Sequence, residues 1–249
     1  MFSVRLTIVL TAAATCAIAT LHAQELPPYA PPAPPGSMTT SQIPGLDFSL
    51  QYPVEFTVQP TQDFLALMRQ GHLNVYGSDP AKDPEHVQAE KCMHTLFYAI
   101  SGKPVTSETT DTPDTLLVLD VDRTCIPKKI GDDKALSQLT GSMLSVPEFK
   151  PMVQQMWFMG GAGRRIHSGM AGTTFKVPSE AQGAPAREVT LAVAAASFVQ
   201  KDHWIVVMYI NGTQEVPIHK TFGFTSVVFS DNKPVLLYPF LLGSINLIK

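Results

Sequence analysis

Two cysteines, Cys92 and Cys125, have the most readable chemistry in this sequence. A third, Cys16, lies in an N-terminal stretch expected to be removed, so the mature chain would keep only this pair. Two thiols in an exported protein are expected to oxidise. A redox pair would usually show a Cys-x-x-Cys spacing, which is absent, and a nucleophilic cysteine would need a base nearby. We therefore predict a structural disulfide between Cys92 and Cys125.

Histidine and acidic residues offer weaker candidates. His86, Glu90 and His94 have the spacing of one helical face, but the two histidines lie two turns apart, too far for the usual metal-binding pair. His167 and His203 occur singly, as packed, hydrogen-bonded histidines do. No Gly-x-Ser-x-Gly or His-Glu-x-x-His motif occurs. We therefore expect no catalytic residues, no metal and no cofactor.

A glycine-rich segment and the apolar residues before it suggest a ligand pocket. GGAGRR, residues 160–165, lacks the Gly-Lys-Ser/Thr ending of a phosphate-binding loop and precedes an expected strand, so we interpret it as a loop. The methionine and aromatic cluster before it usually indicates core, although it could hold an apolar ligand. The candidate pocket residues are Met156, Trp157, Arg164, His167, His203 and Trp204.

The N-terminus has the layout of a secretory signal peptide, with one basic residue, an uncharged stretch over 6–21 and small residues around Ala23. Cleavage is expected between Ala23 and Gln24, with Ala19 as a second candidate and lipidation at Cys16 as another alternative. The formal charge of -3 argues against a nucleic-acid partner, and no later apolar stretch is long enough to span a bilayer. We expect a periplasmic or extracellular protein whose partner is a protein or a small ligand of the cell envelope.

The chain is expected to contain three regions: a signal peptide (1–23), a proline-rich disordered linker (24–45) and a single α+β domain (46–249). Apolar periodicity and turn residues predict helices over 61–71, 83–100, 132–144 and 217–229. They predict strands over 46–59 with a bend at Pro53, and over 115–121, 164–177, 187–200 and 204–210. The last two strands should form a hairpin. We predict a mostly antiparallel sheet covered by helices, including 217–229 over its second face.

The order of these elements over roughly residues 46–230 resembles the PsbP-like α/β/α sandwich. Three motifs carry the resemblance: Tyr52-Pro53, the Asp202-His203-Trp204 turn and the segment 221–229. The leader, the proline tract and the cysteine spacing are also similar to those of uncharacterised exported proteins from Gram-negative bacteria. The resemblance implies a non-enzymatic accessory or binding role.

Two alternatives to that role remain open. One is a hydrolase or lyase of the cell envelope with no readable motif, built around His167, His203 and acidic groups. The other is a carrier of a small apolar ligand, built on the methionine and aromatic cluster at 152–159.

Overall fold

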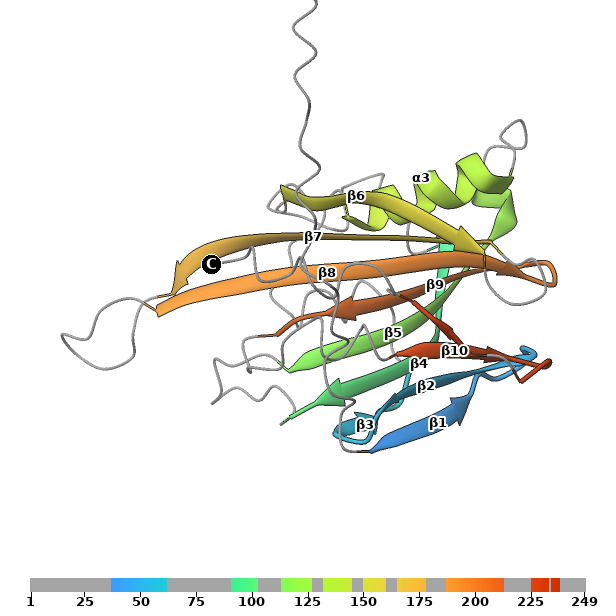
Figure 1. Cartoon of the computed structure of the whole chain (residues 1–249), viewed down its shortest axis with the longest axis horizontal. Helices are drawn as coiled ribbons and strands as arrows, with labels where there is room; N and C mark the ends of the chain where they lie inside the picture. Colours follow the sequence, from blue (N-terminus) through green and yellow to red (C-terminus); the bar gives the residue numbers. More distant parts are fainter. Residues whose placement is uncertain are drawn as a thin grey trace, which may run out of the picture. The chain divides into compact units, whose positions relative to one another are not determined.

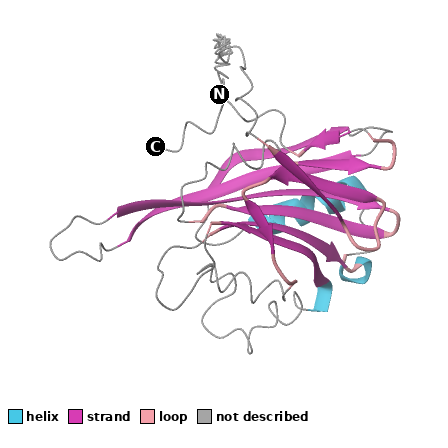
Figure 2. Ribbon diagram, turned by 90° about the horizontal axis from the view of Figure 1, so that it is seen from below, coloured by secondary structure: helices cyan, strands magenta, loops and turns pink. Residues whose placement is uncertain are grey.

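Antiparallel β-strands predominate in the described part of the chain (Figure 1, Figure 2). The structure is a computed structural model that describes residues 37–61, 91–102, 113–126, 132–144, 150–159, 165–177, 187–212, 225–232 and 234–237. All of these residues belong to one compact unit, Pro31–Lys249.

The described strands pair into two sheets. A small sheet has the strand order β1-β2-β10-β11, and a large sheet has the order β3-β4-β5-β9-β8-β7-β6. Their bounds are β1 (Met38–Gln42), β2 (Phe48–Pro53), β3 (Phe56–Val58), β4 (Met93–Ser101), β5 (Asp114–Val121), β6 (Lys150–Met159), β7 (Arg165–Val177), β8 (Arg187–Gln200), β9 (His203–Ile210), β10 (Ser226–Phe229) and β11 (Pro234–Leu236).

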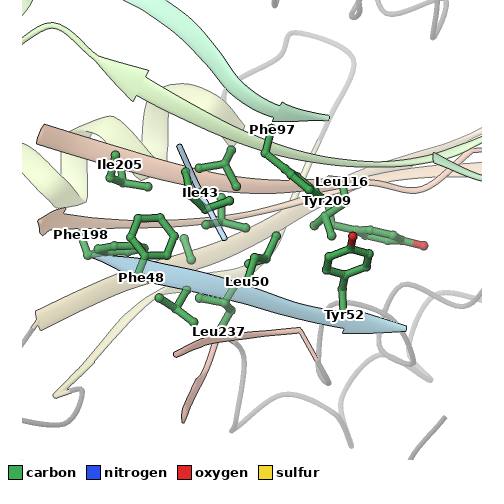
Figure 3. Packing of buried hydrophobic residues seen from close by; sticks show 14 of the residues in the cluster. Ile43, Phe48, Leu50, Tyr52, Phe97, Leu116, Phe198, Ile205, Tyr209 and Leu237 are labelled. Carbon is green, nitrogen blue, oxygen red and sulfur yellow. The ribbon is translucent and has the colours of Figure 1, made fainter. Parts of the chain in front are cut away.

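The small sheet packs against one face of the large sheet. Side chains alternate between the two faces of a strand, so Phe48, Leu50 and Tyr52 of β2 all enter the space between the sheets. The Phe48 ring meets Phe198 of β8 edge-on at 5.4 Å, and the Tyr52 ring lies 5.4 Å from that of Phe97 on β4 (Figure 3). These aromatic contacts between sheets form the main core.

Helix α3 (Asp132–Leu144) packs on the other face of the large sheet, against β6, β7 and β8. It has the predicted bounds, with acidic residues in its first turn and buried Leu136, Met143 and Leu144. Beneath it the hydroxyl oxygens of Thr140 and Ser197 are 2.6 Å apart, and Ser197 Oγ donates to the Leu136 carbonyl at 2.9 Å. This polar contact attaches the helix to β8 beside the apolar contacts of Leu136 and Met143.

The predicted helix-covered α/β/α sandwich is wrong. A helix over 217–229 was expected to cover the second sheet face, but Ser226–Phe229 form strand β10, and 217–224 lie outside the described residues. β10 pairs with β2, so the small sheet supplies that cover. Hydrogen bonding between these distant segments overrides the helical periodicity.

Two further predictions need correction. Within the expected helix 83–100, the chain from Met93 onward is strand β4, which pairs with both β3 and β5. Its residues from Phe97 to Ile100 are all buried because both faces of this strand are covered, and such a run has no strand-like alternation. Within the expected linker, Met38–Gln42 form β1, which pairs with β2. The expected helix 61–71 lies almost entirely outside the described residues.

Several local predictions are confirmed. Strands form at β2, β3, β5, β7, β8 and β9 close to their expected bounds. The hairpin between β8 and β9 is present, and Gln200 pairs with His203 across a turn in which Lys201 has a φ of 55°. This left-handed conformation is unusual for a lysine.

The structure places Cys92 and Cys125 at disulfide distance, as predicted. Their Cα atoms are 5.9 Å apart, within the usual range for a disulfide. Cys92 immediately precedes β4, and Cys125 ends the 3-10 turn η1 (Arg123–Cys125) that follows β5. The Asp122 backbone N–H donates to the Cys92 carbonyl at 2.8 Å, so the backbone independently holds the two segments together.

Candidate functional site

Helix α3 and the first residue of β7 border an open hollow on the helix-covered face of the large sheet. The hollow has a volume of about 390 Å³ and is lined by Asp132, Asp133, Leu136, Arg165 and Val199. This volume lies at the low end of small-molecule sites, which span about 300–1,000 Å³. Its carboxylates, guanidinium and apolar side chains suit a small ligand with both polar and apolar parts.

Asp133 links the hollow to a buried histidine. One carboxylate oxygen, Oδ2, forms an ion pair with Nη1 of Arg165, and both side chains are about half exposed. The other oxygen, Oδ1, lies 3.8 Å from Nε2 of His167, whose side chain is only 7% exposed. Arg165 and His167 are two residues apart on β7, so both side chains project from the same face toward α3.

The charges around His167 do not favour a base. Burial, and secondarily the Arg165 guanidinium, lower the pKa of His167 below its usual value. The imidazole is therefore neutral near pH 7, and its contact with Asp133 is not an ion pair there. An unpaired Asp133 carboxylate would make the His167 imidazole more basic, but Arg165 already compensates the charge of this carboxylate. The arrangement suits a polar contact better than proton transfer.

A second histidine–carboxylate pair lies at the start of β9. His203 Nδ1 is 2.7 Å from Asp120 Oδ2 of β5, with side chains 45% and 20% exposed, respectively. A carboxylate oxygen accepts, so in this contact the ring N–H at Nδ1 is the donor, and in the neutral imidazole tautomer with that proton Nε2 is an acceptor. General bases in hydrolases have this orientation. The pair is therefore the candidate most compatible with acid–base chemistry.

The large sheet separates the two histidines. His203 has the same side-chain direction as Ile205, Val207 and Tyr209, which face the small sheet. His167 faces α3 instead. The structure therefore does not bring these two predicted pocket residues together.

The other predicted pocket residues lie in several places. Trp204 is buried on the face opposite to His203, and the Arg123 guanidinium carbon lies 4.9 Å from the centre of its ring. Met156 and Trp157 belong to β6, where their backbones are opposite Ser168 and His167 of β7. Lying outside the described residues are Arg164, the expected cleavage position Ala23–Gln24, and His86 and Glu90.

Sequence reasoning assigned no partner to three carboxylates that the fold places in specific environments: Asp114, Asp120 and Asp133. Each interacts with a residue on another element, between 32 and 98 positions away for Asp133 with Arg165, Asp120 with His203 and Asp114 with Gly212. No local pattern reports such partners. The available signal for Asp114 was an acidic residue directly before the apolar run of β5.

No protein-family model matches this chain, and no curated protein is significantly similar to it. Within the described residues, no three His, Cys, Asp or Glu side chains gather closely enough to hold a metal ion. None of the helices in the described part of the chain is long and apolar enough to cross a membrane. The site's geometry and the disulfide therefore carry the functional argument.

Proposed function

We propose that this chain is an exported accessory or binding protein of a Gram-negative cell envelope, without catalytic activity of its own. The Cys92–Cys125 disulfide is the observation that carries the proposal. Disulfides persist in oxidising compartments such as the periplasm and are rare in the cytosol. The signal-peptide pattern before residue 24 supports the same compartment.

The α3 hollow is the proposed ligand contact. Its rim presents Asp132, Asp133 and Arg165, while Leu136 and Val199 supply apolar surface. Removing either member of the Asp133–Arg165 ion pair would change the charge of this rim and leave the sheet core intact, because both side chains are half exposed.

Thermal-shift measurements on the chain starting at Gln24 test this assignment, with free amino acids, sugars and short-chain carboxylates as probes. We expect at least one probe class to raise the melting temperature, and Asp133→Asn and Arg165→Gln to abolish the shift. Asp47→Asn is the matched control, because Asp47 forms a comparable half-exposed ion pair with Lys201 at 2.7 Å. Shifts that are unchanged in both hollow variants would contradict this assignment.

The His203–Asp120 pair favours the alternative, a hydrolase or lyase of the cell envelope. Turnover can be measured with chromogenic esters, phosphates and glycosides, comparing the unsubstituted chain with His203→Ala. His94→Ala is the comparison variant: His94 is an exposed histidine of β4 that lies opposite Asp120, so it separates the effect of the His203–Asp120 pair from that of another nearby imidazole. Saturable turnover that disappears only in His203→Ala would replace the binding proposal with the enzymatic one.

A further inference from the structure

Asp114, the first residue of β5, is a carboxylate inside the protein. It is 0% exposed. Its Oδ1 accepts a hydrogen bond of 2.7 Å from the backbone N–H of Gly212, which follows β9. Its Oδ2 is also buried and has no hydrogen-bond partner in the structure as described. Buried polar atoms are nearly always paired, so this oxygen calls for an explanation.

The surroundings of Asp114 contain no described positive charge that could compensate an ionised carboxylate. From β9, Tyr209 hydrogen-bonds to it and is the titratable group that acts on it. From β4, the residue opposite is Ser101, and beyond it in β3 lies Phe56. From the chain after β9, the contact is the uncharged Gly212.

Ionisation is therefore unfavourable while Asp114 stays enclosed. Burial raises the pKa of Asp114 from 3.8 to about 7, although the hydrogen bonds from Gly212 and Tyr209 oppose this rise. In the neutral form Oδ1 still accepts from Gly212. In the ionised form Oδ2 carries charge with no hydrogen-bond donor among the described residues, and opening of the contact between Asp114 and Gly212 would let water solvate the carboxylate.

We propose that Asp114 is a pH-sensitive latch that holds the start of β5 to the chain leaving β9, closed in its neutral form and opened by ionisation. The device links distant parts of the fold, because Asp114 and Gly212 are 98 residues apart. An exported protein meets the pH of its surroundings, so such a latch would make the Gly212 segment respond to alkalinisation.

The direction of the pH effect on opening follows from the linkage between proton binding by Asp114 and opening of its contact with Gly212. With a closed-state pKa of about 7 and an open-state value of 3.8, opening is least favourable below pH 3.8 and becomes easier as pH rises toward 7. Above pH 7 the effect levels off. Between pH 5 and pH 8 the opening equilibrium should rise on the order of a hundredfold.

Amide hydrogen exchange on the chain starting at Gln24 tests the latch. After correction for the intrinsic pH dependence of exchange, protection of the Gly212 amide should fall on the order of a hundredfold between pH 5 and pH 8. Protection of the Asp122 amide, bound to the Cys92 carbonyl, should not show this change. In Asp114→Asn the Gly212 amide should lose its pH dependence.

Equal Gly212 protection at both pH values, or a pH dependence that persists in Asp114→Asn, would overturn the proposal. A carboxyl NMR titration of the unsubstituted chain provides a measurement that needs no variant. The latch requires the Asp114 carboxyl to titrate far above 3.8, and titration at its ordinary value would also overturn it.

Discussion

Replacing Cys92 and Cys125 together by alanine should strongly destabilise the protein. The disulfide joins residues 33 positions apart, and closing a loop of that length lowers the entropy of the unfolded chain by an amount worth about 3.7 kcal/mol at 25 °C. Domains of this size have unfolding free energies of roughly 5–15 kcal/mol, so the loss would be a quarter or more of the total. Cys92 is also 5% exposed, so its replacement removes some core packing.

Urea unfolding, followed by tryptophan fluorescence, measures this loss on the chain starting at Gln24. The double variant should unfold at lower urea than the oxidised protein, and reducing the unsubstituted chain should give a similar decrease. Cys125→Ala alone is the internal control, because losing either sulfur breaks the same crosslink. A decrease below about 1 kcal/mol would refute the idea that this bond constrains the unfolded chain.

Three further substitutions probe other parts of the structure by the same urea assay. Lys201→Gly should stabilise by roughly 0.5–1 kcal/mol, because relief of the left-handed φ of 55° outweighs a half-exposed ion pair; equal or lower stability would contradict this. Thr140→Val should cost about 1–3 kcal/mol, because it removes a buried hydroxyl that contacts Ser197, whereas exposed Ser142→Ala should be nearly neutral. His167→Gln should reduce the loss of stability as pH falls below 6.5. The pKa of His167 is lowered in the folded protein, so the unfolded chain binds a proton more readily and acidification favours unfolding; identical pH profiles of the two proteins would exclude this role.

Short-range sequence patterns predicted correctly the elements whose stabilising contacts are also short-range. Helix α3 has acidic residues at its start and one apolar face, so its bounds were predicted correctly. The β8–β9 hairpin joins two apolar runs across a short polar turn, which is also a local pattern. The disulfide was predictable because removal of the expected signal peptide would leave two cysteines, which have a single possible internal pairing.

Pairing between segments that are distant in the sequence explains why β10 and β4 were wrongly predicted as helices. β10 lies beside β2, with Ser226 opposite Gln51 across 175 positions, and nothing near Ser226 indicates that partner. β4 has apolar residues on both faces, so its sequence also fits a helical pattern. The pairing of His203 with Asp120 required knowing that β5 and β9 are neighbours, which follows from the sheet order alone.

Export of the chain and oxidation of its cysteines are tested by measuring the compartment and the thiol state of the protein together. The full chain would be expressed in a Gram-negative host, fractionated, and labelled with a thiol-reactive polymer before and after reduction. We expect processed protein beginning at Gln24 in the periplasm or medium, with Cys92 and Cys125 labelled only after reduction. Unprocessed protein in the cytoplasm, with both thiols labelled directly, would contradict it.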